Sequence, residues 1–275
     1  MPQFKKAAVI GVGLIGGSFA AALKENKLAG QVAGISRRRS TVDAALKKGL
    51  IDIGSDSLSA VTGADLLVFA VPPGAIKALA PKIASLTGKD CLVTDVCSTK
   101  VEAGETLSRY FNRYVGSHPL AGSEKKGPES AYPGLFRDSV CVITGSGGRD
   151  RAIIAKLWRD IGSRVIFMSP AAHDRAIAYV SHLPHTVAFS LAGSLPAAFM
   201  KLAAGGFKDT TRIAASDSCL WADIIMSNRK NIARAMTVFE NRFRTLRSAI
   251  AKGDASALER ILSRASLKRR LLERE

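Results

Sequence analysis

The chain of 275 residues is long enough for two modest domains or one large one, with ordinary hydrophobic cores. Hydrophobic residues make up 47% of it and charged residues 23%, which is typical of a soluble globular protein. The net charge of +17 raises nucleic acid as a partner, but the basic excess is spread along the chain and suits small anionic molecules equally well.

The four cysteines lie far apart and form no CxxC pair. This spacing argues against a zinc site and a disulfide framework, and favours reduced thiols in a cytosolic protein. Residues 1–26 superficially resemble a secretory signal, but the glycines at 11, 13, 16 and 17 would weaken its helix. Since no other apolar run approaches the length of a membrane span, we expect a cytoplasmic protein without membrane contact.

Apolar runs alternate with helical stretches over the first 168 residues. Strands are predicted directly before Gly11 and at 31–36, 64–71, 91–96, 114–119, 139–144 and 164–169. Helices are predicted after the glycine turn and at 41–50, 76–86 and 100–111, and the helix at 76–86 is expected to be interrupted at Pro81. The alternation indicates an α/β fold with a mostly parallel, Rossmann-type sheet covered on both faces.

From Pro170 onward the pattern is helical without a convincing strand. One helical run covers 171–195, with a kink or break expected at Pro184, and a longer one lies within 218–254 and ends at Gly253. Helices of this length and apolarity need a large partner surface, so we expect a homodimer through the C-terminal helices. We therefore predict a dinucleotide-binding domain at 1–168 and a helical substrate and dimerisation domain at 169–275.

The stretch GVGLIGG forms a G-x-G-x-x-G fingerprint between the first strand and the first helix. Gly11 permits the tight turn, Gly13 lets a pyrophosphate approach the backbone, and Gly16 allows close packing of helix and strand. The phosphates would lie at the helix N-terminus, at Leu14 and Ile15, where free N–H groups favour anions. The alternative is a purely structural glycine turn.

The end of the second strand bears on the choice of cofactor. NAD sites usually place an acid there, but here Ser36, Arg37 and Arg38 come first and the first acid is Asp43. Because an arginine could pair with a 2′-phosphate, we favour NADP, with NAD as the alternative. Arginines that merely face solvent would explain the pattern equally simply. Val71 and Pro72, after the third strand, complete the predicted cofactor site.

The four histidines are His118, His173, His182 and His185. Pro119 restricts the backbone of His118 to extended conformations, so its side chain projects from a stiff position at a strand end. The other three are spaced H-x8-H-x2-H, which lacks the i, i+4 pairing of common zinc sites. We expect no metal, and a core role for one or two of these histidines is an open alternative.

Four motifs follow one another along the chain: TDVCSTK, GSHPLAGSEKKG, HDRAIAYVSHLPH and GFKDTTRIAASDSCLWADI. Together they resemble the prephenate/arogenate (cyclohexadienyl) dehydrogenase family of tyrosine biosynthesis. The likeness runs from the glycine fingerprint to about residue 245. Proteins of this family have a Rossmann domain followed by a helical dimerisation domain. The resemblance implies that His118 accepts the proton of the substrate's ring hydroxyl, that Ser98 hydrogen-bonds this hydroxyl and His118, and that Arg212 pairs with a substrate carboxylate.

Further positions follow from the same resemblance. His185, His182, Ser123 and Glu124 would lie in or at the substrate pocket, and Asp217 and Trp221 would pack between subunits. The implied reaction is the oxidative decarboxylation of prephenate to 4-hydroxyphenylpyruvate, with hydride transfer to the nicotinamide. An arogenate-preferring or dual-specificity dehydrogenase is the nearest alternative, and an NADP-sensing, nucleic-acid-binding regulator is a distant one. We expect a small-molecule substrate and no nucleic acid.

Overall fold

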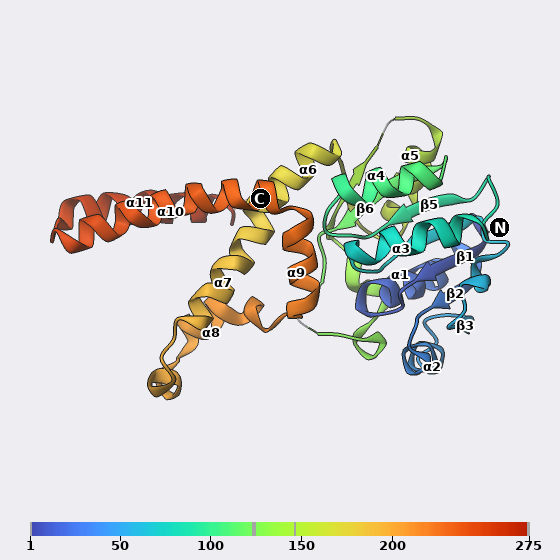
Figure 1. Ribbon diagram of the computed structural model, residues 1–275, viewed down its shortest axis with the longest axis horizontal. Coiled ribbons are helices and arrows are strands. Elements are labelled where there is room, and N and C mark those ends of the chain that lie inside the picture. Colours follow the sequence, from blue (N-terminus) through green and yellow to red (C-terminus); the bar gives the residue numbers. More distant parts are fainter. Residues whose placement is uncertain (1, 123–124, 146, 274–275) are drawn as a thin grey trace. The chain divides into compact units, whose positions relative to one another are not determined.

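The computed structural model describes residues 2–122, 125–145 and 147–273. The chain comprises two compact units, Met1–Arg229 and Lys230–Glu275. The first contains a sheet with its covering helices and a further helical segment (Figure 1). A functional division at residue 168 stays a prediction.

The sheet has eight strands in the order β3-β2-β1-β4-β5-β6-β7-β8. All neighbours are parallel except β6 and β7, so the expected mostly parallel sheet is confirmed. The strands are β1 (Phe4–Ile10), β2 (Ala29–Ile35), β3 (Ile53–Ser55), β4 (Leu66–Phe69), β5 (Leu92–Asp95), β6 (Tyr114–Pro119), β7 (Val140–Thr144) and β8 (Arg164–Phe167). The strand order reverses at β1, and ligands of open α/β sheets bind at such a point.

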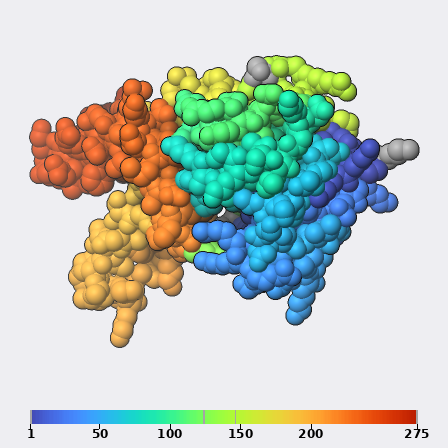
Figure 2. All heavy atoms as spheres, turned by 45° about the vertical axis from the view of Figure 1, so that its right-hand side comes forward, coloured from blue at the N-terminus to red at the C-terminus, as the bar shows by residue number. Residues whose placement is uncertain are grey.

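Helices cover both faces of the sheet, and the strand pattern explains why. Alternate residues of a strand point to opposite faces, so Val9 and Val68 enter one core while Ile10 and Phe69 enter the other. The helices of this region are α1 (Leu14–Glu25), α2 (Arg39–Lys47), α3 (Pro73–Ala84), α4 (Val101–Tyr110) and α5 (Arg149–Asp160). Helices α3 and α4, teal and green in Figure 2, lie next to each other over the second core.

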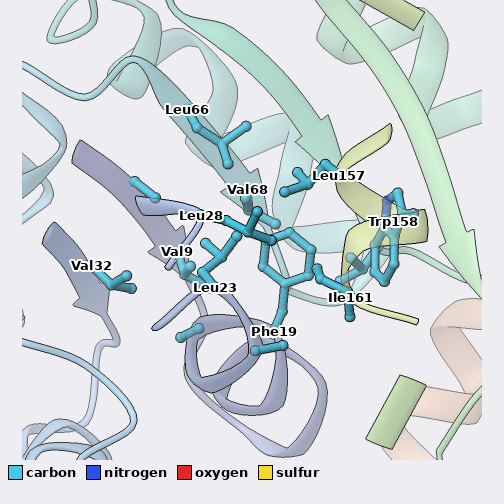
Figure 3. Packing of buried hydrophobic residues seen from close by; sticks show 14 of the residues in the cluster. Val9, Phe19, Leu23, Leu28, Val32, Leu66, Val68, Leu157, Trp158 and Ile161 are labelled. Carbon is cyan, nitrogen blue, oxygen red and sulfur yellow. The ribbon is translucent and has the colours of Figure 1, made fainter. Parts of the chain in front are cut away.

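The first core is built around Phe19 of α1 (Figure 3). Its ring lies against Trp158 of α5, with centroids 5.0 Å apart, and Trp158 contacts Phe136 edge to face at 5.3 Å. These aromatic rings bury a large apolar area beneath β1 and β4. They thereby fix α1, and with it the glycine turn that begins this helix.

Two helices of the sheet region differ from expectation. Helix α3 continues through Pro81 without interruption, since this proline lies on the exposed side near the end of the helix. Helix α5 was not predicted, although its buried residues Ile154, Ala155, Leu157 and Trp158 follow a helical spacing.

The described residues of the helical segment after residue 169 contain no strand, as expected. It comprises α6 (Pro170–Ile177), a π-helical turn (Ala178–His182), α7 (Leu183–Gly193), α8 (Gly205–Thr211) and α9 (Ser218–Ser227). The π-helical turn is the break expected near Pro184, which lies in the first turn of α7 where a missing N–H costs little. Short 3₁₀ turns lie at Leu58–Val61, Pro128–Ser130, Pro133–Phe136, Ala197–Leu202 and Arg212–Ala215.

The prediction of one helix over 218–254 was wrong, because α9 ends at Ser227 and α10 (Arg229–Ala251) begins after Asn228. The buried side chain of Asn228 donates its amide N–H to the backbone carbonyl oxygen of Asp174, 2.8 Å away. This bond holds the chain in a non-helical conformation, with φ −118° at Asn228.

In the second unit, α10 is followed by α11 (Ala255–Leu271). Gly253 has φ +65°, a conformation that favours glycine, and α10 ends two residues before it. The carboxylate of Asp254 caps α11 by accepting the N–H of Ala257 at 2.9 Å. None of the helices described in either unit is long and apolar enough to cross a membrane.

Candidate functional site

Parallel pairing brings the predicted site residues to one edge of the sheet. The register aligns Ile10, Phe69, Asp95 and Gly116 across β1, β4, β5 and β6. The chain leaves the sheet just beyond these positions at Gly11, Val71 and Ser98, and His118 is the last residue but one of β6. These residues therefore lie at or just beyond the carboxyl ends of neighbouring strands, where α/β proteins bind ligands.

The glycine turn has the shape that a dinucleotide requires. Gly11 has φ +93°, and a Cβ on Gly16 would lie 1.8 Å from the carbonyl oxygen of Gly11. A Cβ on Gly13, in contrast, would meet no atom within 4 Å, so Gly13 faces open space. Gly13 also precedes Leu14 and Ile15 as the N-cap of α1, without a side-chain cap. The turn thus offers backbone N–H groups to an anion, and these residues fit a pyrophosphate.

The three arginines after β2 differ in their surroundings. Arg39 pairs with Asp43 at 2.9 Å, one turn along α2. Arg37 and Arg38 are exposed and form no ion pair among the described residues. Ser36 is tied to the sheet by its N–H, which donates to the carbonyl oxygen of Ser55 at 3.1 Å. Two cations are therefore available at the end of β2.

The end of β4 is joined to the end of β5. The thiol of Cys97 donates to the carbonyl oxygen of Val71 at 3.3 Å, and Pro72 forms the N-cap of α3. Burial and the neighbouring Asp95 raise the pKa of this thiol far above its ordinary value, so Cys97 stays a neutral donor.

His118 lies in β6, and the backbone beside it is held firmly. The ammonium group of Lys100 donates to the carbonyl oxygen of Ser117 at 2.6 Å. The hydroxyl of Ser117 lies 2.8 Å from that of Thr94 on β5. Because both bonds are buried, the imidazole of His118 projects from a rigid strand end, as Pro119 predicted.

A buried ion pair lies beneath this strand end. Lys100 and Asp95 are fully buried and paired through Nζ and Oδ2. Asp95 also accepts the hydroxyl proton of Tyr114 at 2.7 Å and the N–H of Cys97 at 3.0 Å. Burial, followed by the charge of Asp95, raises the pKa of Tyr114 well above its ordinary value, so this phenol remains a neutral donor.

The ring of His118 is bonded to a second histidine. His118 Nδ1 lies 2.8 Å from Nε2 of His173 on α6, and His173 Nδ1 lies 2.7 Å from Asp174 Oδ1. Burial lowers the pKa of His118 far below its ordinary value, and His173, Lys100 and His182 act in the same direction. His118 is therefore a neutral imidazole at neutral pH.

Asp174 is the anionic end of this chain of bonds. Its carboxylate accepts the backbone N–H groups of Lys100 at 2.8 Å and Val101 at 3.0 Å, at the beginning of α4. Burial by itself would raise the pKa of Asp174, but hydrogen bonds from His173 and these two amides outweigh it and lower the pKa below its ordinary value. Asp174 is ionised at neutral pH.

Ser98 lies three residues beyond Asp95 and is half-buried. Its hydroxyl has no hydrogen-bond partner among the described residues, and the bond from Ser98 to His118 stays a prediction. Of the two ring nitrogens of His118, Nδ1 is bonded to His173. Ser98 therefore presents an unused hydroxyl at the same sheet edge.

His185 and His182 both contact Trp221 of α9. The rings of His185 and Trp221 are stacked, with centroids 3.5 Å apart and an angle of 20° between their planes. His182 meets Trp221 edge to face at 6.0 Å. The structure thus places these three residues together within one chain, while packing of Trp221 between subunits stays a prediction.

The two histidines differ in burial. Burial lowers the pKa of the fully buried His182 to about 4. Its Nδ1 accepts from the side chain of Asn228 at 3.2 Å, and its Nε2 has no partner among the described residues. Burial, with the charge of Arg212, lowers the pKa of the half-buried His185, whose Nδ1 donates to the carbonyl oxygen of Ser181.

Arg212 is exposed and close enough to His185 for its charge to act there, so the structure brings these two predicted residues together. Asp217 caps α9 through the N–H of Leu220 at 3.0 Å and pairs with Lys126 at 2.9 Å. The predicted pocket residues Ser123 and Glu124 lie outside the described part of the chain.

Sequence reasoning missed His173, Asp174, Lys100 and Asp95 as parts of this site. A signal was present, because Asp95 lies within an apolar strand and Lys100 comes soon after it, and buried charges must pair. The adjacent His173 and Asp174 gave no comparable sign, since their partners lie far away in the sequence. Among the described residues, no cluster of three or more His, Cys, Asp or Glu is placed to hold a metal ion.

Comparison with known proteins identifies the family. Residues 19–167 match the family model described as prephenate dehydrogenase, nucleotide-binding domain, and residues 169–264 match prephenate dehydrogenase, dimerization domain. The chain belongs to the prephenate dehydrogenase family. It is accordingly a dehydrogenase that uses a nicotinamide cofactor, and its C-terminal part is of the dimerization type.

Several relatives of the family are similar over nearly the whole chain. Cyclohexadienyl dehydrogenase of Zymomonas mobilis is 35% identical, covering 94% of this chain and 92% of its own. Prephenate dehydrogenase of Bacillus subtilis is 34% identical, covering 96% of this chain and 76% of its own. The crystal structure of Aquifex aeolicus prephenate dehydrogenase with hydroxyphenyl propionate and NAD+ has a TM-score of 0.91 at 32% identity, over 98% of both chains. The structure of Synechocystis arogenate dehydrogenase has a TM-score of 0.80 at 27% identity, covering 97% of this chain and 99% of its own.

Proposed function

We propose that the protein catalyses the oxidative decarboxylation of prephenate to 4-hydroxyphenylpyruvate in tyrosine biosynthesis. The observation that carries the proposal is His118, a buried neutral imidazole at the same sheet edge as the glycine turn. A general base must be unprotonated at the working pH, and His118 is unprotonated because its pKa is lowered.

His118 begins the reaction by accepting the proton of the substrate's ring hydroxyl. A bound nicotinamide supplies the acceptor for the hydride that leaves the same ring carbon. The carbon–carboxylate bond then breaks, its electron pair makes the ring aromatic, and carbon dioxide departs. His118 returns the proton to the phenolic oxygen, so the protein ends in its starting state and no proton is released.

The surrounding side chains have roles in binding. Ser98 donates its unused hydroxyl to the oxygen that His118 deprotonates, and Arg212 pairs with a substrate carboxylate through its planar guanidinium. His185 lies beside Arg212 and binds the side chain of the substrate. His182 supports this pocket, and Ser123 and Glu124 are proposed as further residues of the substrate site.

NADP is the proposed cofactor, with Gly11, Gly13, Leu14, Ile15 and Gly16 holding its pyrophosphate, and Val71 and Pro72 beside its nicotinamide end. Arg37 and Arg38 support this choice, because they leave two exposed cations at the end of β2 where an acid would repel a 2′-phosphate. The related Aquifex aeolicus structure contains NAD+, so NAD is the alternative.

Arogenate is the alternative substrate, motivated by the Synechocystis arogenate dehydrogenase among the similar structures. The two substrates differ in their side chain, which carries a keto group in prephenate and an ammonium group in arogenate. We favour prephenate because Arg212 and the positive net charge suit the more anionic molecule.

A homodimer is the proposed assembly, in keeping with the match to a dimerization domain. The segment Ala197–Leu202 exposes Phe199, Met200 and Leu202 by 54%, 65% and 77%, and such an apolar surface is suited to a second copy. A cytoplasmic location, without nucleic-acid or membrane partners, stays part of the proposal.

A two-by-two assay tests the function. Prephenate or arogenate is mixed with NADP or NAD and the purified protein, and reduced nicotinamide is followed by its absorbance. We expect the highest kcat/KM with prephenate and NADP. Preference for arogenate would reassign the pocket around His185 and keep the base, whereas absence of turnover in all four mixtures would refute the proposed function.

A further inference from the structure

The hydrogen bonds around His118 extend in one line through two further residues of α6. Asp174 Oδ1, both ring nitrogens of His173 and Nδ1 of His118 follow one another at 2.7 and 2.8 Å. All three side chains are buried, and the two imidazole rings meet edge to face with centroids 5.0 Å apart. Solvent therefore does not compete for these bonds.

The carboxylate of Asp174, at one end of this chain of hydrogen bonds, determines which ring nitrogens of His173 and His118 carry a proton. Asp174 is ionised, so its carboxylate only accepts, and the proton it shares lies on Nδ1 of His173. An imidazole with its single proton on Nδ1 has a lone pair on Nε2, and in His173 this Nε2 accepts the Nδ1–H of His118. His118 is left with its lone pair on Nε2.

We propose that His173 is a positioning residue that holds His118 in the tautomer with a basic Nε2. A neutral histidine side chain in water favours the opposite tautomer, with its proton on Nε2, and this form could not accept the substrate's proton there. His173 thus keeps His118 ready for proton transfer. This role rests on the proposed function of His118 as the base.

The same line stabilises His118 after proton transfer. Once Nε2 is protonated, the Nδ1–H of the imidazolium already donates to His173, and His173 in turn donates to the carboxylate of Asp174. A carboxylate that orients a catalytic histidine in serine proteases acts by the same principle. Here a second imidazole lies between the carboxylate and the base, so the carboxylate acts over a longer distance.

Asp174 has a structural task as well, which is the rival explanation for this arrangement. Its carboxylate accepts the first amides of α4, at Lys100 and Val101, and α4 has no side-chain cap from its own residues. If capping were the whole role of this region, substitution of His173 would change stability without changing the tautomer of His118. The tautomer is therefore the measurement that separates the two explanations.

The first experiment is 15N NMR of the full-length wild-type protein with labelled imidazole nitrogens. The chain has four histidines, and His118→Asn identifies the signals of His118. We expect a protonated Nδ1 and an unprotonated Nε2 at neutral pH. The opposite tautomer of His118 in the wild type would overturn the proposal, and this result needs no variant of His173.

The second experiment compares His173→Leu with His173→Gln. Leucine cannot accept the Nδ1–H of His118, whereas the amide oxygen of glutamine can. For His173→Leu we expect kcat to fall by about 10- to 100-fold with little change in KM or in dinucleotide affinity, and the Nε2–H tautomer of His118 to appear. His173→Gln should keep most of the kcat and the wild-type tautomer.

Normal kcat in His173→Leu, or equal losses in both variants, would overturn the proposal. If His173→Leu does not fold, the wild-type tautomer and the kcat of His173→Gln still decide. A wild-type protein with the expected tautomer but no turnover of prephenate or arogenate would refute the proposed function alone. The two failures are therefore distinguishable.

Discussion

Lys100 and Asp95 form an ion pair in which both side chains are completely buried, directly beneath the strand end that carries His118. Removing one member of a buried pair leaves an uncompensated charge and costs about 3–5 kcal/mol. We expect Lys100→Met to lower the free energy of unfolding by about this amount, measured by urea denaturation. The matched control is Arg113→Ala, which removes the half-exposed pair with Asp150 and should cost about 1 kcal/mol or less. Equal effects of the two substitutions would contradict this expectation.

The glycines of the turn separate a ligand-binding role from a packing role. Gly13→Ala places its methyl group in open space, so stability should stay near that of the wild type while dinucleotide affinity falls about 10-fold or more. Gly16→Ala would drive its methyl group into the carbonyl oxygen of Gly11 and should destabilise the fold. Thermal unfolding and titration with the dinucleotide measure both effects. Tight dinucleotide binding by Gly13→Ala would remove this turn from the cofactor site.

The arginines after β2 offer an internal comparison for cofactor choice. Arg37→Ala and Arg38→Ala should raise KM for NADP about 10-fold, the scale of one charge-assisted hydrogen bond, with little change for NAD. Arg39→Ala serves as the control, since Arg39 is already paired with Asp43. Steady-state kinetics with both cofactors decides, and an unchanged ratio of NADP to NAD use in all three variants would refute the assignment.

Substitution of the base should affect turnover and spare cofactor binding. We expect His118→Asn to lower kcat by about 100-fold or more, while dinucleotide affinity measured by fluorescence titration stays unchanged. Since the pKa of His118 is below its ordinary value, the acidic limb of kcat/KM in the wild type should lie below pH 6.5. Near-normal turnover of His118→Asn would assign the proton transfer to another group.

Stability should fall as the pH is lowered below neutrality. His182 has an ordinary pKa of 6.5 and a pKa of about 4 in the folded protein, so the unfolded chain binds more protons between these values. The free energy of unfolding therefore decreases as pH falls from 6.5 to 4, by about 3 kcal/mol from His182. His182→Asn removes the titrating group and keeps an acceptor for Asn228, so this variant should show a flatter dependence in urea denaturation. An identical pH dependence of the variant and the wild type would contradict the assignment.

Local patterns in the sequence predicted the parts of the fold that depend on neighbours in the chain. The apolar runs identified seven of the strands, and the glycine spacing identified the turn before α1. Strand β3 has only three residues, too few for a period to show. The break between α9 and α10 depends on a bond from Asn228 to Asp174, and no local pattern at Asn228 encodes it.

The same distinction applies to the site. Motifs indicated His118, Ser98, His185 and Arg212, and the structure places the first two at one sheet edge and the last two beside each other. The role of His173 could not be predicted, since its partner His118 is 55 residues away. The lowered pKa of His118 likewise arises from burial, which is a property of the folded chain.

Asp174 contacts the beginning of α4 from 74 residues further along the chain. A fragment ending at residue 168 would keep the glycine turn, His118 and α4, but it would lose the caps of α4 and the acceptor for His118. Such a fragment would keep the proposed nucleotide-binding turn but lack the residues that orient the proposed base. The residues that orient His118 for proton transfer therefore come from the second of the two stretches that match the family.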